Sequence, residues 1–113
     1  MSNRIRSSRD VIVRTSQLVN AQEFYSQVLG FSVTNDSERL LRVETGAFRL
    51  FVESGNTPHG PVFDFLVPDI QAAKTRLLAA GCVLVEEDSS VPRCYLRDPF
   101  GLVFNLGLTA TPD

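Results

Sequence analysis

Two stretches of this sequence have the spacing of an amphipathic helix that ends at a glycine, and similar strand-like segments surround each of them. In residues 16–30, apolar side chains recur at intervals of three and four positions, and Gly30 follows at the end. Either Ser16 or Asn20 is a suitable N-cap. Residues 69–81 repeat the arrangement, with Asp69 as the expected N-cap and Gly81 as the terminator. The spacing therefore predicts two helices.

Each predicted helix follows one strand-like segment and precedes three more. The predicted strands are residues 11–15, 31–34, 40–44 and 48–53 in the first half, and 62–67, 83–86, 93–96 and 102–106 in the second. The same order occurs twice, which indicates an internal duplication. We predict an α+β fold of two βαβββ modules, about residues 10–54 and 61–108, in a single domain of residues 1–113.

One helix covers only one face of a four-stranded sheet. The other face must be buried elsewhere or line a cavity, so two such modules are expected to form an open, cupped, barrel-like sheet around a binding cavity. Within this sheet, Phe63, Phe65 and Phe104 are expected to pack in the core, because they alternate with Val62, Asp64 and Leu66, which are expected to face the cavity.

The composition argues against several kinds of partner. The formal net charge of -2 and the pI of about 5.3 provide no overall attraction to nucleic acid or to an anionic membrane. No apolar run approaches the roughly 20 residues that cross a bilayer, and the polar N-terminus does not resemble a signal peptide, so a cytoplasmic location is expected. Cys82 and Cys94 are interpreted as reduced packing residues.

Two other groups of residues are expected to be solvated. The basic residues Arg4, Arg6 and Arg9 are interpreted as a terminal tail. His59, the single histidine, lies among turn-forming residues and is expected to be an exposed loop residue.

Two motifs carry a family resemblance. The segment FYSQVLGF at residues 24–31 and the segment RDPFGLVF at residues 97–104 resemble signatures of the vicinal-oxygen-chelate superfamily, which includes glyoxalases, bleomycin-resistance proteins and extradiol dioxygenases. Residues 67–73 and 79–81 are similar to the second helix of that family. The resemblance implies paired βαβββ modules around a U-shaped cavity, very often in a homodimer. It does not imply one reaction, because members include metal-dependent enzymes and metal-free proteins that sequester a drug.

The resemblance also places four metal-ligand positions, at Asp10, Phe51, Val62 and Asn105. A catalytic metal needs at least three nitrogen or oxygen side-chain ligands, and Phe51 and Val62 provide none. We therefore expect no metal cofactor. The alternative is a divalent metal bound by carboxylates. Glu53 and Asp64 lie two residues along on the same strand faces as Phe51 and Val62, so a register slip would bring them to the site with Asp10.

Charged residues on the predicted inner strand faces are ligand-binding candidates. Arg14 lies on the same strand face as Asp10 and suits a ligand carboxylate or phenolate, or else forms an ion pair with Asp64 or Glu53. The same two alternatives apply to Arg49. Phe51 is a candidate wall for a planar ligand. Asp64 lies mid-strand between two phenylalanines, where a carboxylate needs a partner or a function.

The main functional hypothesis is a metal-independent protein that binds or sequesters a small organic molecule. A homodimer is expected, and neither nucleic acid nor a membrane is expected as a partner. Its predicted ligand-binding residues are Asp10, Arg14, Arg49, Phe51, Asp64 and Asn105. The alternative is a lyase, isomerase or dioxygenase that uses a carboxylate-bound metal or Asp64 as general base. A module that serves only in dimerisation or regulation is a third reading.

Overall fold

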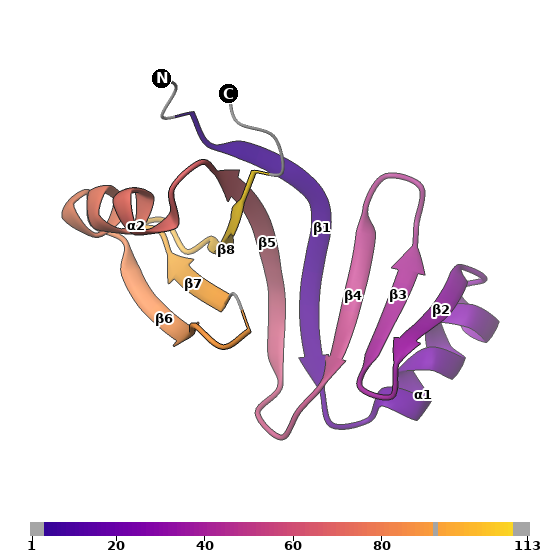
Figure 1. The fold of residues 1–113 in the computed structure, drawn as a ribbon. Coiled ribbons are helices and arrows are strands. Elements are labelled where there is room, and N and C mark those ends of the chain that lie inside the picture. Colours follow the sequence, from indigo (N-terminus) through magenta and orange to yellow (C-terminus); the bar gives the residue numbers. More distant parts are fainter. Residues whose placement is uncertain (1–3, 92, 110–113) are drawn as a thin grey trace. The chain divides into compact units, whose positions relative to one another are not determined.

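The computed structural model describes residues 4–91 and 93–109 of the chain. The described residues form an α+β fold in which the order strand, helix, strand, strand, strand occurs twice, so the predicted pair of βαβββ modules is confirmed (Figure 1). The elements are β1 (Arg6–Thr15), α1 (Leu18–Glu23), η1 (Phe24–Val28), β2 (Ser32–Ser37), β3 (Leu40–Glu44), β4 (Arg49–Ser54), β5 (His59–Val67), α2 (Ile70–Ala79), β6 (Val83–Asp88), β7 (Arg93–Arg97) and β8 (Val103–Leu108).

The chain divides into two compact units with the same internal topology. The first unit comprises residues 9–61, and the second comprises the described residues of 1–8 and of 62–113. The strand order is β2-β3-β4-β1 in the first unit and β5-β8-β7-β6 in the second. In each unit the first and last strands pair in parallel and the remaining neighbours are antiparallel. This agreement supports the duplication predicted from the sequence.

In the first unit, α1 and η1 cover one face of the sheet. Side chains that alternate along β3 and β4 make this core with Leu18, Ala21 and Tyr25 of the helical segment; the buried residues are Leu41, Val43, Leu50 and Val52. The opposite face, which carries no helix of this unit, presents the other set of alternating side chains.

The helical segment of the first unit differs from the prediction at both ends. Its N-cap is Gln17, not Ser16 or Asn20, and no side chain caps it. From Phe24 onward the backbone hydrogen bonds span five residues, as in the bond from the Leu29 N–H to the Phe24 carbonyl. A π-helical turn rotates the following side chains away from the α-helical face. The helical spacing of residues 16–30 predicts that Phe24, Val28 and Leu29 lie on the buried face, but they are 48%, 68% and 47% exposed.

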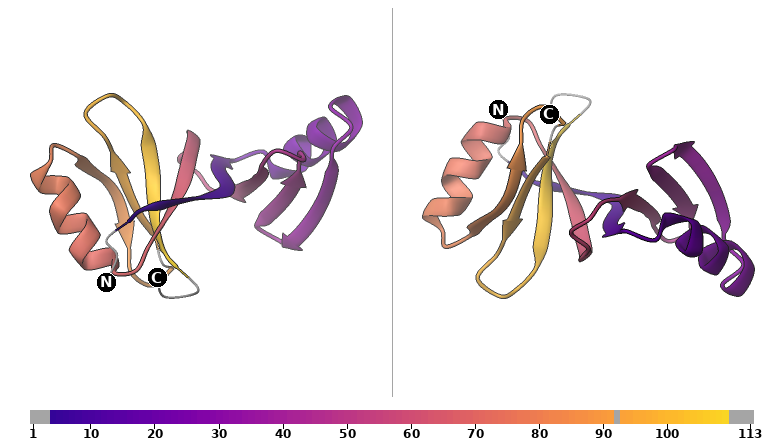
Figure 2. Two further views of the ribbon diagram at one scale, coloured as in Figure 1. Left: turned by 90° about the horizontal axis from the view of Figure 1, so that it is seen from above. Right: turned by 90° about the horizontal axis from the view of Figure 1, so that it is seen from below.

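In the second unit, α2 covers one face of its sheet (Figure 2). Asp69 caps this helix as predicted, because its Oδ1 accepts a hydrogen bond from the Ala72 N–H at 3.0 Å. Gly81 follows the helix with a φ of 107°, a conformation that favours glycine, and a Cβ there would lie 3.2 Å from Pro99 Cγ. The buried core residues are Val67, Ala73, Cys82, Cys94, Leu96, Phe104 and Leu106.

Three expectations about individual residues have different outcomes. Phe104 is buried and its ring centroid lies 4.8 Å from that of Phe65, as expected for core residues. Phe63 is 39% exposed, because the core cluster beneath α2 does not extend to the start of β5, so its core prediction is wrong. Arg6 and Arg9 are exposed, as expected, but they lie in β1 and therefore do not belong to a frayed tail.

Neither helix described in the structure is long and apolar enough to cross a membrane.

Candidate functional site

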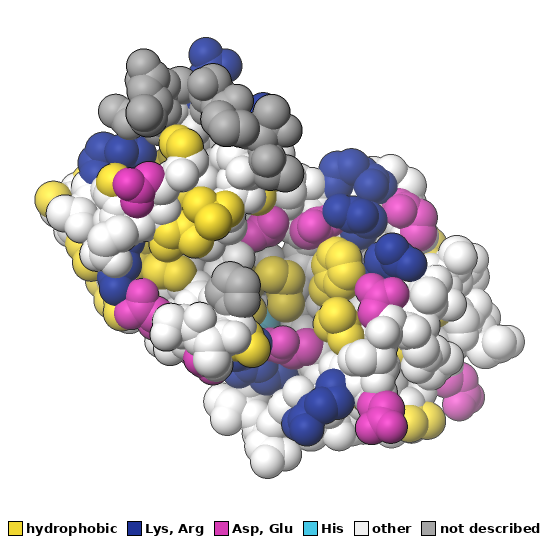
Figure 3. Space-filling view, in the orientation of Figure 1, with side chains coloured by type: hydrophobic (Ala, Val, Ile, Leu, Met, Phe, Trp, Pro, Cys, Tyr) yellow, Lys and Arg dark blue, Asp and Glu magenta, His cyan; other side chains and the backbone are white. Residues whose placement is uncertain are grey.

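The helix-free face of the first unit carries two rows of side chains across its four strands. Strand register places Ser32 beside Glu44, Glu44 beside Arg49, and Arg49 beside Asp10. The neighbouring row contains Thr34, Arg42, Phe51 and Ile12 in the same strand order. Because directly paired residues point to the same face, these rows form one mixed polar and aromatic surface. Figure 3 shows basic and acidic side chains gathered over β3 and β4.

Asp10, Arg49 and Phe51 come together on this face. Arg49 donates two hydrogen bonds to Asp10, from Nε to Oδ1 at 2.8 Å and from Nη2 to Oδ2 at 3.1 Å. Its guanidinium carbon also lies 5.7 Å from the ring centroid of Phe51. The bidentate geometry and the ring contact hold the guanidinium in a defined orientation beside a partly exposed aromatic ring.

Arg14 forms an intramolecular ion pair, which was one of its two predicted roles. Its Nε and Nη2 each lie 2.9 Å from Oε1 of Glu53, and its Nη1 lies 3.5 Å from the Thr57 carbonyl oxygen. Gly55 provides the space for this arrangement, because a Cβ at that position would lie 2.5 Å from Arg14 Cδ. Arg14 is therefore fixed in place by its neighbours.

His59 does not lie in an exposed loop as predicted. It is the first residue of β5 and is only partly exposed. Its Nδ1 lies 2.8 Å from the Gly60 carbonyl oxygen and its Nε2 lies 4.0 Å from Oε1 of Glu53.

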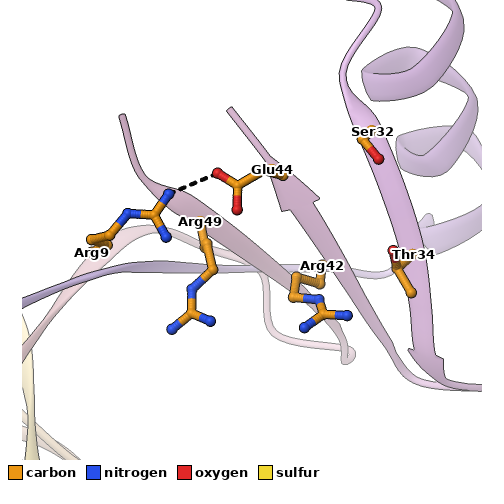
Figure 4. Close-up of a pocket in the computed structure, with 6 residues that line it drawn as sticks. All are labelled: Arg9, Ser32, Thr34, Arg42, Glu44 and Arg49. Atoms are coloured by element: carbon orange, nitrogen blue, oxygen red, sulfur yellow. Dashed lines mark hydrogen bonds and ion pairs between the residues drawn. The ribbon is translucent and has the colours of Figure 1, made fainter. Parts of the chain in front are cut away.

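A hollow of about 280 Å³ lies over one end of the two rows (Figure 4). Arg9, Arg42 and Arg49 contribute guanidinium groups from three different strands, and Glu44 is the single acidic side chain in the lining. Ser32 and Thr34 complete the lining from β2. Of these residues only Arg49 was predicted from the sequence. Ser32, Thr34, Arg42 and Glu44 could have been found only by combining strand alternation with the correct register of β2 and β3. Arg9 could not have been found in this way, because alternation along β1 places it on the face opposite to Asp10.

Glu44 links the side chain of Arg9 to the loop at Gly46 on one side of this hollow. Its Oε2 accepts hydrogen bonds from Arg9 Nη2 at 2.7 Å and from the Gly46 N–H at 3.0 Å. The Gly46 N–H, followed by the Arg9 guanidinium, lowers the pKa of Glu44 from its ordinary value. Arg9 in turn donates a second hydrogen bond to the Gly46 carbonyl oxygen at 3.2 Å, so the loop and both side chains form one network.

In the second unit, Asp64 and Asn105 lie beside each other in the parallel pair of β5 and β8. Asn105 donates a hydrogen bond from Nδ2 to Oδ1 of Asp64 at 3.0 Å and accepts one from the Cys94 N–H at 2.9 Å. Ser8 donates to the other Asp64 oxygen at 3.1 Å. Hydrogen bonds from Ser8 and Asn105 therefore stabilise the mid-strand carboxylate of Asp64.

The donors at the four family metal positions do not fit a catalytic metal site. Both carboxylate oxygens of Asp10 accept from Arg49, and the amide oxygen of Asn105 accepts from the backbone. Phe51 and Val62 have no donor atom in their side chains. Among the residues that the structure describes, no group of three or more His, Cys, Asp or Glu side chains is arranged to hold a metal ion.

Comparison with solved structures relates this fold to dioxygenases and to a smaller protein. The chain is similar to an extradiol ring-cleaving dioxygenase from B. fuscum, with 18% identity, a TM-score of 0.64, and coverage of 97% of this chain and 34% of that chain. For homoprotocatechuate 2,3-dioxygenase from Brevibacterium fuscum in complex with 3,4-dihydroxyphenylacetate, the identity is 20% and the TM-score is 0.63. That match covers 97% of this chain and 38% of the dioxygenase chain, so this chain spans little more than a third of the dioxygenases.

A second kind of match covers nearly the whole of both chains. A glyoxalase/bleomycin resistance protein/dioxygenase superfamily member from Vibrio splendidus 12B01 is 21% identical with a TM-score of 0.56, covering 93% of this chain and 97% of that one. These identities show a shared fold. No curated protein sequence matches the chain significantly. A family model for a glyoxalase-like domain matches residues 10–107. The chain therefore belongs to the glyoxalase-like domain family, within the vicinal-oxygen-chelate superfamily.

Proposed function

We propose that this protein binds a small organic molecule on the helix-free face of its first unit, without a catalytic metal ion. One observation carries the proposal. The side-chain oxygens at the family metal positions already accept hydrogen bonds from other groups of the protein, above all those of Asp10 from Arg49. Charged side chains that are paired and oriented in this way can recognise polar groups of a ligand, but they provide no open set of metal ligands.

Phe51 supports an organic ligand with a planar part. It is the aromatic member of its row, lies partly exposed between Arg42 and Ile12, and its ring is approached from one side by Arg49. A planar group can stack on such a ring while a nearby guanidinium binds its polar substituent. Arg14 contributes a further fixed charge on this face. On the helix-free face of the second unit, Asp64 and Asn105 stay predicted ligand contacts.

The similarity to the Brevibacterium fuscum enzyme suggests a first probe. That neighbour was solved with 3,4-dihydroxyphenylacetate, an aromatic carboxylate, bound to it. An aromatic acid combines the two features that the first unit of this chain could recognise, a planar ring and a negative charge. We therefore propose small aromatic acids as the first compounds to screen.

Thermal unfolding of the full chain tests metal and organic ligands side by side. Mg²⁺, Mn²⁺, Fe²⁺ and Zn²⁺ should give no saturable rise in Tm, and EDTA should not lower it, whereas at least one aromatic acid should raise it. At a ligand concentration of 100 times the Kd, the expected stabilisation is about 2.7 kcal/mol. A saturable metal effect that EDTA reverses would overturn the proposal and favour the metal-dependent lyase, isomerase or dioxygenase.

A pair of phenylalanine variants locates the organic ligand. Phe51→Leu should weaken binding of a stabilising aromatic acid by about tenfold, the equivalent of roughly 1.4 kcal/mol. Phe100→Leu is the matched control, because Phe100 is 94% exposed in the turn before β8 and lies on neither row. Equal affinities of the two variants would place the ligand away from Phe51.

We also propose that the protein acts as a homodimer. Exposed apolar side chains on the helical segment of the first unit support this, since Val19, Phe24 and Val28 leave much of their surface in solvent. Light scattering coupled to size-exclusion chromatography should give twice the mass of the 12.5 kDa chain. A monomer mass across the micromolar range would contradict the dimer without affecting the ligand-binding proposal.

A further inference from the structure

We propose that the hollow lined by Arg9, Ser32, Thr34, Arg42, Glu44 and Arg49 binds an oxyanion, the carboxylate or phosphate group of the ligand. This inference rests on the proposed function and makes it more specific, because it names the chemical class of the ligand and the groups that select it. Below, these six residues are called the oxyanion pocket.

Charge is the first argument for an oxyanion. Three guanidinium groups meet a single carboxylate in the lining of the pocket. Figure 4 shows Arg42 and Arg49 extending from neighbouring strands toward the same side, while Arg9 contacts Glu44. Guanidinium groups bind carboxylate and phosphate through pairs of parallel N–H donors, which makes them well suited to this ligand class.

Arg42 has the largest unused donor capacity in the pocket. Arg49 is bound to Asp10 and Arg9 to Glu44, each at hydrogen-bond distance. By contrast, the only charged contact of Arg42 among the described residues is with Asp36, at 3.4 Å, and its side chain is 42% exposed. Most N–H groups of Arg42 therefore remain available to a ligand, whereas Arg9 and Arg49 are held in position by their own carboxylates.

Ser32 and Thr34 add hydroxyl donors on the β2 side. Register pairs Ser32 with Glu44 and Thr34 with Arg42, so each hydroxyl lies next to a charged member of the pocket. Neither hydroxyl has a hydrogen-bond partner within the part of the chain that the structure describes. Hydroxyl groups beside guanidinium groups are a common donor set for carboxylate and phosphate oxygens.

The size of the oxyanion pocket suits one end of a ligand. Its volume of about 280 Å³ is at the lower limit of typical small-molecule sites, which span roughly 300–1,000 Å³. Phe51 is paired with Arg42 across β3 and β4 and touches Arg49, so it adjoins the pocket. The pocket would hold the oxyanion while the planar part of the same ligand lies on Phe51.

The test uses the full-length ¹⁵N-labelled chain and three probes, inorganic phosphate, benzoate and benzamide. Benzamide has the ring and size of benzoate without its charge. Arg42→Gln removes the guanidinium with the most available donors, and Arg42→Lys retains the charge but loses the planar fork. Arg39→Gln is the matched control, because Arg39 is an exposed arginine of the same unit that does not line the pocket.

Phosphate and benzoate should each cause saturable chemical-shift changes at the backbone amides of Ser32 and Thr34 and at Arg42 Nε. Arg42→Gln should weaken both by about tenfold, as expected for a lost charge-assisted hydrogen bond, with a smaller loss for Arg42→Lys. Arg39→Gln should leave both affinities unchanged. Dispersed spectra of the variants, matching that of the parent chain outside the pocket, establish that they are folded.

The possible results distinguish failure of the oxyanion pocket from failure of the proposed function. If benzoate and benzamide bind equally and both depend on Phe51, organic binding stands and the oxyanion pocket is wrong. If phosphate binds at the pocket while no organic compound does, the pocket stands and the proposed function is wrong. Equal weakening by Arg42→Gln and Arg39→Gln, or shifts that map elsewhere, would overturn the pocket by showing nonspecific attraction to positive charge.

Discussion

The amide oxygen and the amide nitrogen of Asn105 both form hydrogen bonds within the protein. Its amide oxygen accepts from the Cys94 backbone and its amide nitrogen donates to Asp64. A carboxylate in the same place could accept but not donate, and it would face a second carboxylate at hydrogen-bond distance. In this chain, the position that family enzymes commonly use for a metal-binding glutamate is therefore suited to an amide.

Asn105→Asp should destabilise the protein by about 2–4 kcal/mol at pH 7, because it replaces a buried hydrogen bond with like-charge repulsion. Urea unfolding followed by circular dichroism measures this difference. Asn56→Asp makes the same change of charge at an exposed loop position and should shift the midpoint little. A midpoint for Asn105→Asp equal to that of the control would show that the amide is not required.

Glu44 should titrate below the ordinary range of a glutamate, since the Gly46 N–H and Arg9 lower its pKa. A lowered pKa in the folded state means that the unfolded chain binds more protons. The stabilisation is therefore present above the ordinary glutamate pKa and is lost as the pH falls through the lower, folded-state value. Carbon-detected NMR titration of the Glu44 carboxyl measures this pKa.

Arg9→Gln separates the two causes of the Glu44 shift. It should raise the pKa of Glu44 only part of the way to its ordinary value, because the larger contribution comes from the Gly46 N–H. A complete return to the ordinary value would assign the effect to Arg9 alone.

At the scale of elements, the two helices begin differently. Asp69 lies in extended backbone and its side chain accepts from the Ala72 N–H, which satisfies one of the free donors in the first turn of α2. Gln17, at the equivalent position before α1, makes no such bond. The cap of α2 was predicted correctly because aspartate has a strong preference for this position. The cap of α1 was predicted wrongly because no side chain caps that helix.

Asp69→Ala should lower the free energy of unfolding by about 1 kcal/mol, and Asp69→Ser should recover most of this loss because serine is also an effective cap. Chemical denaturation at fixed pH compares the variants. Gln17→Ala is the paired control and should have little effect, since Gln17 makes no capping bond. A similar loss from Gln17→Ala would mean that the effect does not arise from capping.

At the scale of the whole molecule, each unit has its own buried cluster under its own helical segment. Cys82 and Cys94 both belong to the cluster of the second unit and are free thiols. Burial raises the pKa of each thiol, so less of the reactive thiolate is present than in an exposed cysteine. The reactivity of these thiols therefore reports on the opening of the second unit.

The single domain predicted for residues 1–113 stays a prediction.

Both thiols should react slowly with a disulfide reagent such as DTNB in native buffer and rapidly in urea. The rate in buffer should follow the stability of variants in the second unit, with Asp69→Ala reacting faster than the parent chain. Absorbance of the released thiolate gives the rate directly. Rapid reaction of either cysteine in the native protein would contradict its placement in the core.

The order of elements, most strand positions and the cap of α2 could be predicted from the sequence, because these depend on alternation and local preferences. The predicted strand 40–44 has the bounds of β3. Alternation also placed Asp10 and Arg14 on one face of their strand, and Arg49 and Phe51 on one face of another. The family resemblance implied that both of these faces line the cavity.

The folded structure was needed to show which of these side chains are paired and which remain available to a ligand. The sequence left Arg14 between a ligand and an ion pair, and strand packing brought Glu53 to it. The oxyanion pocket depends on register, since Thr34 meets Arg42 and Glu44 meets Arg49 only when three strands are aligned. Local patterns specify the face of a strand, but contacts between strands distant in sequence arise from the packing of the whole sheet.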